Sequence, residues 1–168
     1  MRLPMCLLAL VTASAYGSPV MAKPLDAFLA GFDDACAYSA SLDGFFRSSY
    51  LFARGEGALD VPADLSDTIG TPSVTPQDEY LRILIPVIDG TWRGVPVREF
   101  EIYITREASG FVYHGVNFDR AATDMAAATF TSIGARAKDN LGTSEGAETN
   151  TGFSLHDGQP AYFCDSST

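Results

Sequence analysis

The sequence has few of the residues and motifs that most enzymes use for catalysis. Its 168 residues include two histidines, one tryptophan and three cysteines, and Lys and Arg together number only 11. It has no S-x-x-K pair, H-E-x-x-H helix, EF-hand loop or P-loop. The histidines, His114 and His156, stand far apart in the chain, and a zinc site would need two further ligands. We therefore expect neither a metal site nor a cofactor.

Positive charge is also scarce. Asp and Glu number 21, which gives a formal net charge of −10 at pH 7. A surface of this sign repels the phosphates of nucleic acids and anionic lipid headgroups. It attracts a basic protein and speeds the encounter with it, although the same charge also serves plain solubility. We expect no nucleic acid partner, and a basic protein is the partner that the charge favours.

Long hydrophobic runs are absent after the first residues. Residues 1–22 are typical of an export signal peptide, because Arg2 precedes the apolar run Leu3–Ala13 and small residues follow. Cleavage after Ala22 is favoured over cleavage after Ala15, and the alternative is a buried N-terminal helix. No later stretch has 18 consecutive apolar residues, so we expect no membrane span. The sequence thus predicts an exported protein, periplasmic in a bacterium and otherwise secreted.

The remainder, residues 23–168, is long enough for a single domain with its own core. Without Arg2 it carries a net charge of −11. It retains two cysteines, Cys36 and Cys164, and an even pair in an exported chain predicts a disulfide. A catalytic role for Cys36 is the competing interpretation, and the absence of a nearby base in the sequence disfavours it.

The hydrophobic pattern predicts an α+β fold. Helical spacing of apolar residues indicates helices over residues 24–41 and 120–137, with a shorter helical piece between 45 and 52. Residues 54–78 are rich in Gly, Pro, Asp, Ser and Thr and should form a long surface connection with one short helix. Apolar residues on both faces predict a central strand over 80–88. Further strands are predicted over 95–105, from alternation, and over 110–118, and a hairpin is predicted around Asp157–Gly158. The expected fold has two layers, with a mostly antiparallel sheet of about five strands and two main helices, in the order α-β-β-β-α-β-β.

Glu99 and Glu101 form the one carboxylate pair with a catalytic spacing. Two residues apart on a strand, they project from the same face at about 7 Å from each other. Glycoside hydrolases use carboxyl groups separated by about 5–9.5 Å. The same pair also fits the solvated face of an amphipathic strand, and we favour that interpretation because Phe100, Ile102 and Ile104 make the opposite face apolar.

Trp92 and Arg93 follow a strand at a turn. These residue types are enriched at the centres of protein interfaces, so the pair is a candidate contact surface. A tryptophan near a turn equally serves to close the edge of a core, and the pattern favours this second role.

The segment Ser109–Tyr113, SGFVY, resembles the S-G-x-x-Y motif of several families of bacterial periplasmic lysozyme inhibitors. The resemblance covers these five residues and implies that Ser109 and Tyr113 contact the catalytic region of a partner enzyme. Those inhibitors are mainly β proteins, whereas this sequence predicts two long helices, so the resemblance does not extend to the fold.

Three functions follow from these features. The favoured one is a non-catalytic binding protein, an inhibitor or immunity protein that neutralises a basic envelope-targeting enzyme, with Trp92, Arg93, Ser109 and Tyr113 as candidate contacts. The second is a small hydrolase whose site combines Glu99, Glu101, Tyr113 and His114. The third is a structural envelope component, which would present a large apolar patch. The partner's identity and the oligomeric state stay open.

Overall fold

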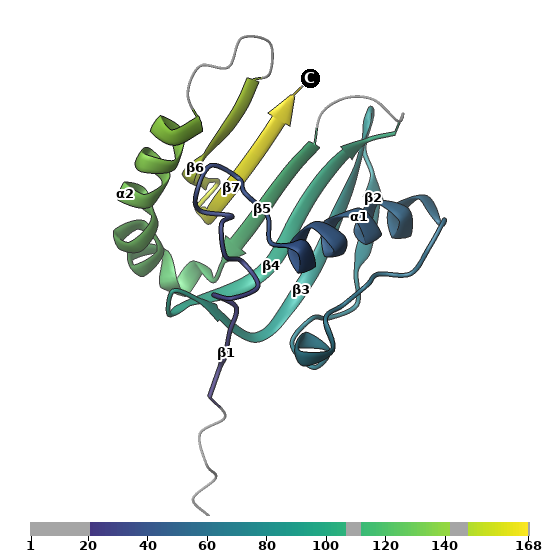
Figure 1. The fold of residues 1–168 in the computed structure, drawn as a ribbon, viewed down its shortest axis with the longest axis horizontal. Helices are drawn as coiled ribbons and strands as arrows, with labels where there is room; N and C mark the ends of the chain where they lie inside the picture. The colour runs from purple at the N-terminus through teal and green to yellow at the C-terminus, as the bar shows by residue number, and fades with distance from the viewer. Residues whose placement is uncertain (1–20, 107–111, 142–147, 168) are drawn as a thin grey trace, which may run out of the picture.

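The computed structural model describes residues 21–106, 112–141 and 148–167. Most of the predicted export signal and Ser109 therefore lie outside the described residues. Figure 1 shows a strongly twisted sheet, with α1 (Ala40–Arg54) crossing over its middle strands and α2 (Thr123–Leu141) running alongside one edge.

The protein is an α+β protein whose sheet is mostly antiparallel, as predicted. The strands follow the order β1-β3-β4-β5-β7-β6, β2 pairs with β3, and only the short β1–β3 pairing is parallel. Five strands are long, and the two that the sequence pattern did not reveal have only two and four residues. The strands are β1 (Lys23–Pro24), β2 (Ser73–Pro76), β3 (Tyr80–Trp92), β4 (Val95–Thr105), β5 (Val112–Phe118), β6 (Glu148–His156) and β7 (Gln159–Ser167).

The helix expected over residues 24–41 was wrong. Residues 26–36 form a series of turns, in which Gly31, Ala35 and Cys36 take positive φ angles of 87°, 55° and 58° that no α-helix allows. The first helix is instead α1, which begins where the Ser39 hydroxyl accepts a hydrogen bond from the Leu42 amide. The apolar residues of the turn segment still enter the core, as their helical spacing suggested: Leu25, Phe28, Leu29 and Phe32.

The second helix lies where the sequence places it. The Asp119 side chain accepts a hydrogen bond from the Ala121 amide and starts a 3-10 turn, η2 (Arg120–Ala122), which leads directly into α2. α2 packs closely on β6 because Gly134 meets Gly152 there. A β-carbon at Gly134 would approach the Gly152 backbone to 2.8 Å, so no larger residue fits without a shift.

The core lies on one face of the sheet, under α1, α2 and the turn segment. Phe100 of β4, Val116 of β5 and Tyr162 of β7 are register partners that point to this side. Phe45 of α1 contacts Phe100, and Phe130 of α2 contacts Tyr162. The opposite face of these strands is not covered by either helix.

One short helix was expected within the surface connection at residues 54–78. The structure has a single turn of 3-10 helix there, η1 (Ala63–Leu65). Two tight hairpin turns, Arg93–Gly94 and Asp157–Gly158, have positive φ at both residues, as two-residue hairpin loops of this type require. The second of these turns was predicted from the sequence.

The predicted disulfide is present. Cys36, at the end of the turn segment, is bonded to Cys164 on β7, and 128 residues separate the two in the sequence. The bond fixes a segment without regular hydrogen bonding to β7, the strand next to the β6 edge of the sheet. Arg93 adds a second attachment, because its guanidinium is 2.6 Å from the buried carboxylate of Asp33.

Removal of this disulfide should lower stability strongly. For Cys36→Ala combined with Cys164→Ala, we expect the free energy of unfolding to fall by about 3–5 kcal/mol, because a long loop in the unfolded chain is no longer constrained. Urea denaturation of oxidised wild type, reduced wild type and the double variant measures this. Reduced wild type should match the variant, and a loss under about 1 kcal/mol would contradict the stabilising role.

Candidate functional site

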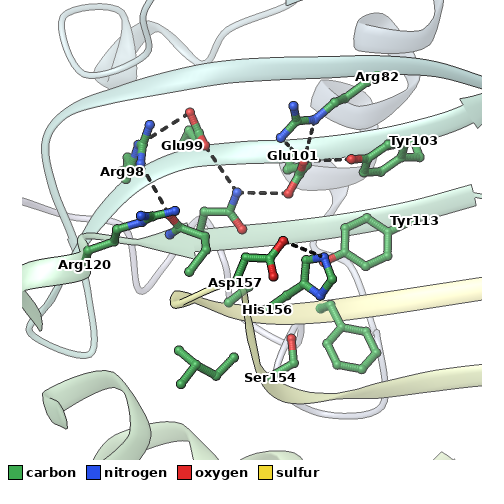
Figure 2. Close-up of a pocket in the computed structure, with 15 residues that line it drawn as sticks. Arg82, Arg98, Glu99, Glu101, Tyr103, Tyr113, Arg120, Ser154, His156 and Asp157 are labelled. Carbon is green, nitrogen blue, oxygen red and sulfur yellow. Dashed lines mark hydrogen bonds and ion pairs between the residues drawn. The ribbon is translucent and has the colours of Figure 1, made fainter. Parts of the chain in front are cut away.

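The uncovered face of the sheet holds a pocket of about 700 Å³, within the size range of ligand and side-chain binding sites. Figure 2 shows arginine, glutamate and tyrosine side chains from β3, β4 and β5 pointing into it, together with residues near the β6–β7 turn. The lining residues are Arg82, Arg98, Glu99, Glu101, Tyr103, Tyr113, Asn117, Arg120, Ser154, Leu155, His156, Asp157, Gln159, Ala161 and Phe163.

A β-bulge in β4 builds part of this lining. Val97 pairs with Phe118 and Glu99 pairs with Asn117, so Arg98 is an extra residue with no partner on β5. Val97 and Phe100 both point into the core, which leaves Arg98 and Glu99 on the same open face. A strand with strict alternation would have sent one of these two side chains to the core.

Glu101 is the best-connected side chain of the pocket. Its Oε1 accepts hydrogen bonds from the Arg82 guanidinium, at 2.6 Å from Nε, and from the Tyr103 hydroxyl, at 3.0 Å. Its Oε2 accepts one from Nδ2 of Asn117 at 3.0 Å. Burial and the nearby Glu101 raise the pKa of the Tyr103 hydroxyl, which keeps it a donor. The carboxylate is therefore held in place by donors on three strands.

The side-chain amide of Asn117 bridges the two glutamates. Nδ2 of Asn117 donates to Oε1 of Glu99 at 3.3 Å as well as to Oε2 of Glu101, so one amide nitrogen fills the space between the carboxylates. In a glycoside hydrolase that space receives the scissile bond. The arrangement instead suits a fixed set of hydrogen-bonding groups.

Aromatic rings form one wall of the pocket. Tyr113 stacks on Phe163 with ring centroids 6.0 Å apart, and its ring meets Tyr103 edge to face at 5.7 Å. Its ring lies over Gly115, where a β-carbon would approach it to 2.9 Å. Burial, followed by the charge of Glu101, raises the pKa of the Tyr113 hydroxyl. Tyr113 thus lines the pocket from a strand.

His114 lies on the opposite face of β5 and takes no part in this pocket. It is 5% exposed and stacks on Phe46 with ring centroids 3.9 Å apart. Nδ1 bonds the Tyr38 hydroxyl at 2.8 Å, and Nε2 bonds the Tyr50 hydroxyl. Burial lowers the pKa of His114 to about 3, so the ring is neutral and donates to one tyrosine while it accepts from the other. His114 therefore does not join Glu99, Glu101 and Tyr113 in the pocket, whereas His156 lines it.

The remaining candidates are separated from the pocket. Trp92 is 1% exposed and packs against Phe130 in the core, with ring centroids 4.6 Å apart, so its ring is not accessible to a partner. Arg93 is half exposed and bound to Asp33. Of the four predicted contact residues, the structure brings only Tyr113 to the pocket, and Ser109 is not among the described residues.

Several residues of the pocket were not identified from the sequence, notably Arg82, Arg98, Asn117, Arg120 and Gln159. One signal was available for Arg98. The apolar positions of β4 run 95, 97, 100, 102 and 104, and this change of phase after Val97 indicates a bulge. The others depend on how strands pair across the sheet.

Within residues 21–106, 112–141 and 148–167, no three His, Cys, Asp or Glu side chains are grouped so as to hold a metal ion. No helix in these ranges is both long and apolar enough to cross a membrane. Comparisons with protein families, with curated proteins and with solved structures give no match to this chain.

The buried histidine makes stability depend on pH. The folded pKa is about 3 and the unfolded pKa about 6.5, so between these values the unfolded state binds more protons, and stability falls as the pH is lowered. From pH 7 to pH 4.5, His114 should remove roughly 2–3 kcal/mol of the free energy of unfolding.

Urea denaturation at the two pH values tests this. His114→Gln should lose less stability on acidification than wild type, by that amount. His156→Gln is the matched control, because the His156 side chain is 91% exposed and should leave the wild-type pH dependence unchanged. Equal pH dependence in wild type and His114→Gln would contradict a neutral buried imidazole.

Proposed function

We propose that this protein is an exported, non-catalytic binding protein that receives a basic protein partner on the open face of its sheet. The partner would be an envelope-targeting enzyme that it inhibits or neutralises. The observation that carries the proposal is the open pocket of about 700 Å³, whose charged groups are bonded to one another.

The organisation of the pocket supports binding over catalysis. The Glu101 carboxylate accepts hydrogen bonds from Arg82, Tyr103 and Asn117. It is therefore a fixed acceptor and not a free base. Groups already held in one geometry lose little conformational entropy when a partner binds. Tyrosine and arginine, which supply five of the fifteen lining residues, are also residue types that contribute most at interface centres.

Charge supports a basic partner. The pocket lining contains three arginines and three acidic residues, so it is close to balanced, while the whole chain has a formal charge of −10. The excess of negative charge therefore lies outside the pocket. In this arrangement the overall field steers a basic protein toward the molecule, and the pocket supplies the specific contacts.

Binding to purified basic cell-wall hydrolases tests the proposal. Lysozymes of several types and a basic amidase would be presented to the purified protein in biolayer interferometry at 20 and 150 mM NaCl. We expect at least one to bind with an association rate that falls about tenfold or more with added salt, and to lose activity in a cell-wall lysis assay.

A variant with a filled pocket tests whether the partner binds on the open face of the sheet. Ser154→Trp places a large ring in the pocket lining on β6, and it should weaken binding at least about tenfold. Arg47→Trp is the matched control, since the Arg47 side chain is 73% exposed on α1, over the other face of the sheet. Full binding by Ser154→Trp would contradict the assigned face, and no binding to any enzyme of the set would contradict the proposed partner class.

A further inference from the structure

Two arginines converge at the end of the pocket nearest the β6–β7 turn. Nη1 of Arg98 and Nε of Arg120 each lie 3.3 Å from Oε1 of Gln159. Arg98 reaches this point because of the β4 bulge, and Arg120 because it is the first residue of η2 after β5. Figure 2 shows both guanidinium groups side by side at this end.

Gln159 is held so that its oxygen faces the arginines. Its Nε2 donates to the Phe118 carbonyl oxygen at 2.7 Å, which fixes the amide orientation. The acceptor shared by the two cations is therefore a neutral amide oxygen, which cannot balance their charge.

The charge at this end is incompletely compensated. Glu99 is the only acidic group paired with Arg98, at 3.8 Å, and in the described part of the chain Arg120 has no ion pair. Arg98, Arg120 and Glu99 together carry a local charge of +1, and Asp157, the remaining acidic residue of the lining, is 90% exposed and lies 3.5 Å from His156 instead. Each guanidinium has five N–H donors, and Gln159 engages one from each. The free donors are accessible, because more than half of the Arg98 side chain is exposed.

We infer that Arg98, Arg120 and Gln159 form a subsite for a carboxylate. A planar monoanion matches the forked donors of arginine and neutralises the local charge of +1. A dianion such as phosphate would meet the charge of Glu99 and the negative charge of the chain. Leu155, which is 57% exposed and also lines the pocket, supplies an apolar surface for the carbon atoms that carry the carboxylate.

The identity of the group that carries the carboxylate rests on the proposed function. In a complex with a protein partner it is the side chain of an aspartate or glutamate, which enters the pocket at this end. A basic protein can present such a residue within a positive surface, and the specific contact then fixes its orientation on the sheet.

Titration with sodium acetate, followed by ¹H–¹⁵N NMR at constant ionic strength, tests the subsite without any partner. We expect saturable shifts for the amides of Arg98, Glu99, Arg120 and Gln159, with a dissociation constant on the order of 10 mM for so small a ligand. Arg98→Gln combined with Arg120→Gln should weaken acetate binding at least about tenfold. Arg47→Gln, an exposed arginine on α1, should leave it unchanged.

The results of these titrations distinguish the carboxylate subsite from the proposed function. Shifts that sodium chloride reproduces, or that persist in the double glutamine variant, would overturn the subsite, and so would phosphate binding more tightly than acetate at pH 7.5. Unchanged spectra elsewhere in the double variant confirm that it is folded. Acetate binding without any enzyme binding would overturn only the proposed function, and enzyme binding without acetate binding would overturn only the subsite.

Discussion

The open face depends on one constraint within β4, which must send both Val97 and Phe100 into the core. A regular strand cannot do this, since the two positions lie three residues apart and side chains alternate with a period of two. The bulge at Arg98 resolves the conflict. It places Arg98 beside Glu99 on the uncovered face and moves the register with β5, so that Asn117 stands opposite Glu99.

From that register the rest of the face follows. Asn117 reaches both glutamates, Arg82 and Tyr103 complete the acceptor positions of Glu101, and the polar groups are satisfied by one another. Because α1, α2 and the disulfide-bound turn segment all lie on the other side, nothing in the described chain covers this network. A balanced, preorganised polar face on an acidic protein is suited to recognition of another molecule.

Local patterns predicted much of the fold. Alternating and continuous apolar patterns located the long strands, and the Asp157–Gly158 turn and the disulfide of Cys36 were correct. The helix over residues 24–41 was wrong because apolar residues spaced by three and four can also enter a core from successive turns, which Gly31 and Cys36 impose here. The pocket was largely missed, since strand register, which a single sequence does not display, decides that Arg82 and Gln159 line one surface.

The central claim is that the pocketed face of the sheet, and not the helical face, contacts the partner. Covalent footprinting of arginines with phenylglyoxal, with and without a bound basic enzyme, addresses it most directly. We expect phenylglyoxal labelling of Arg98 and Arg120 to fall strongly in the complex, while labelling of Arg47, on α1, stays constant. Protection of Arg47, with Arg98 and Arg120 still fully labelled, would contradict it.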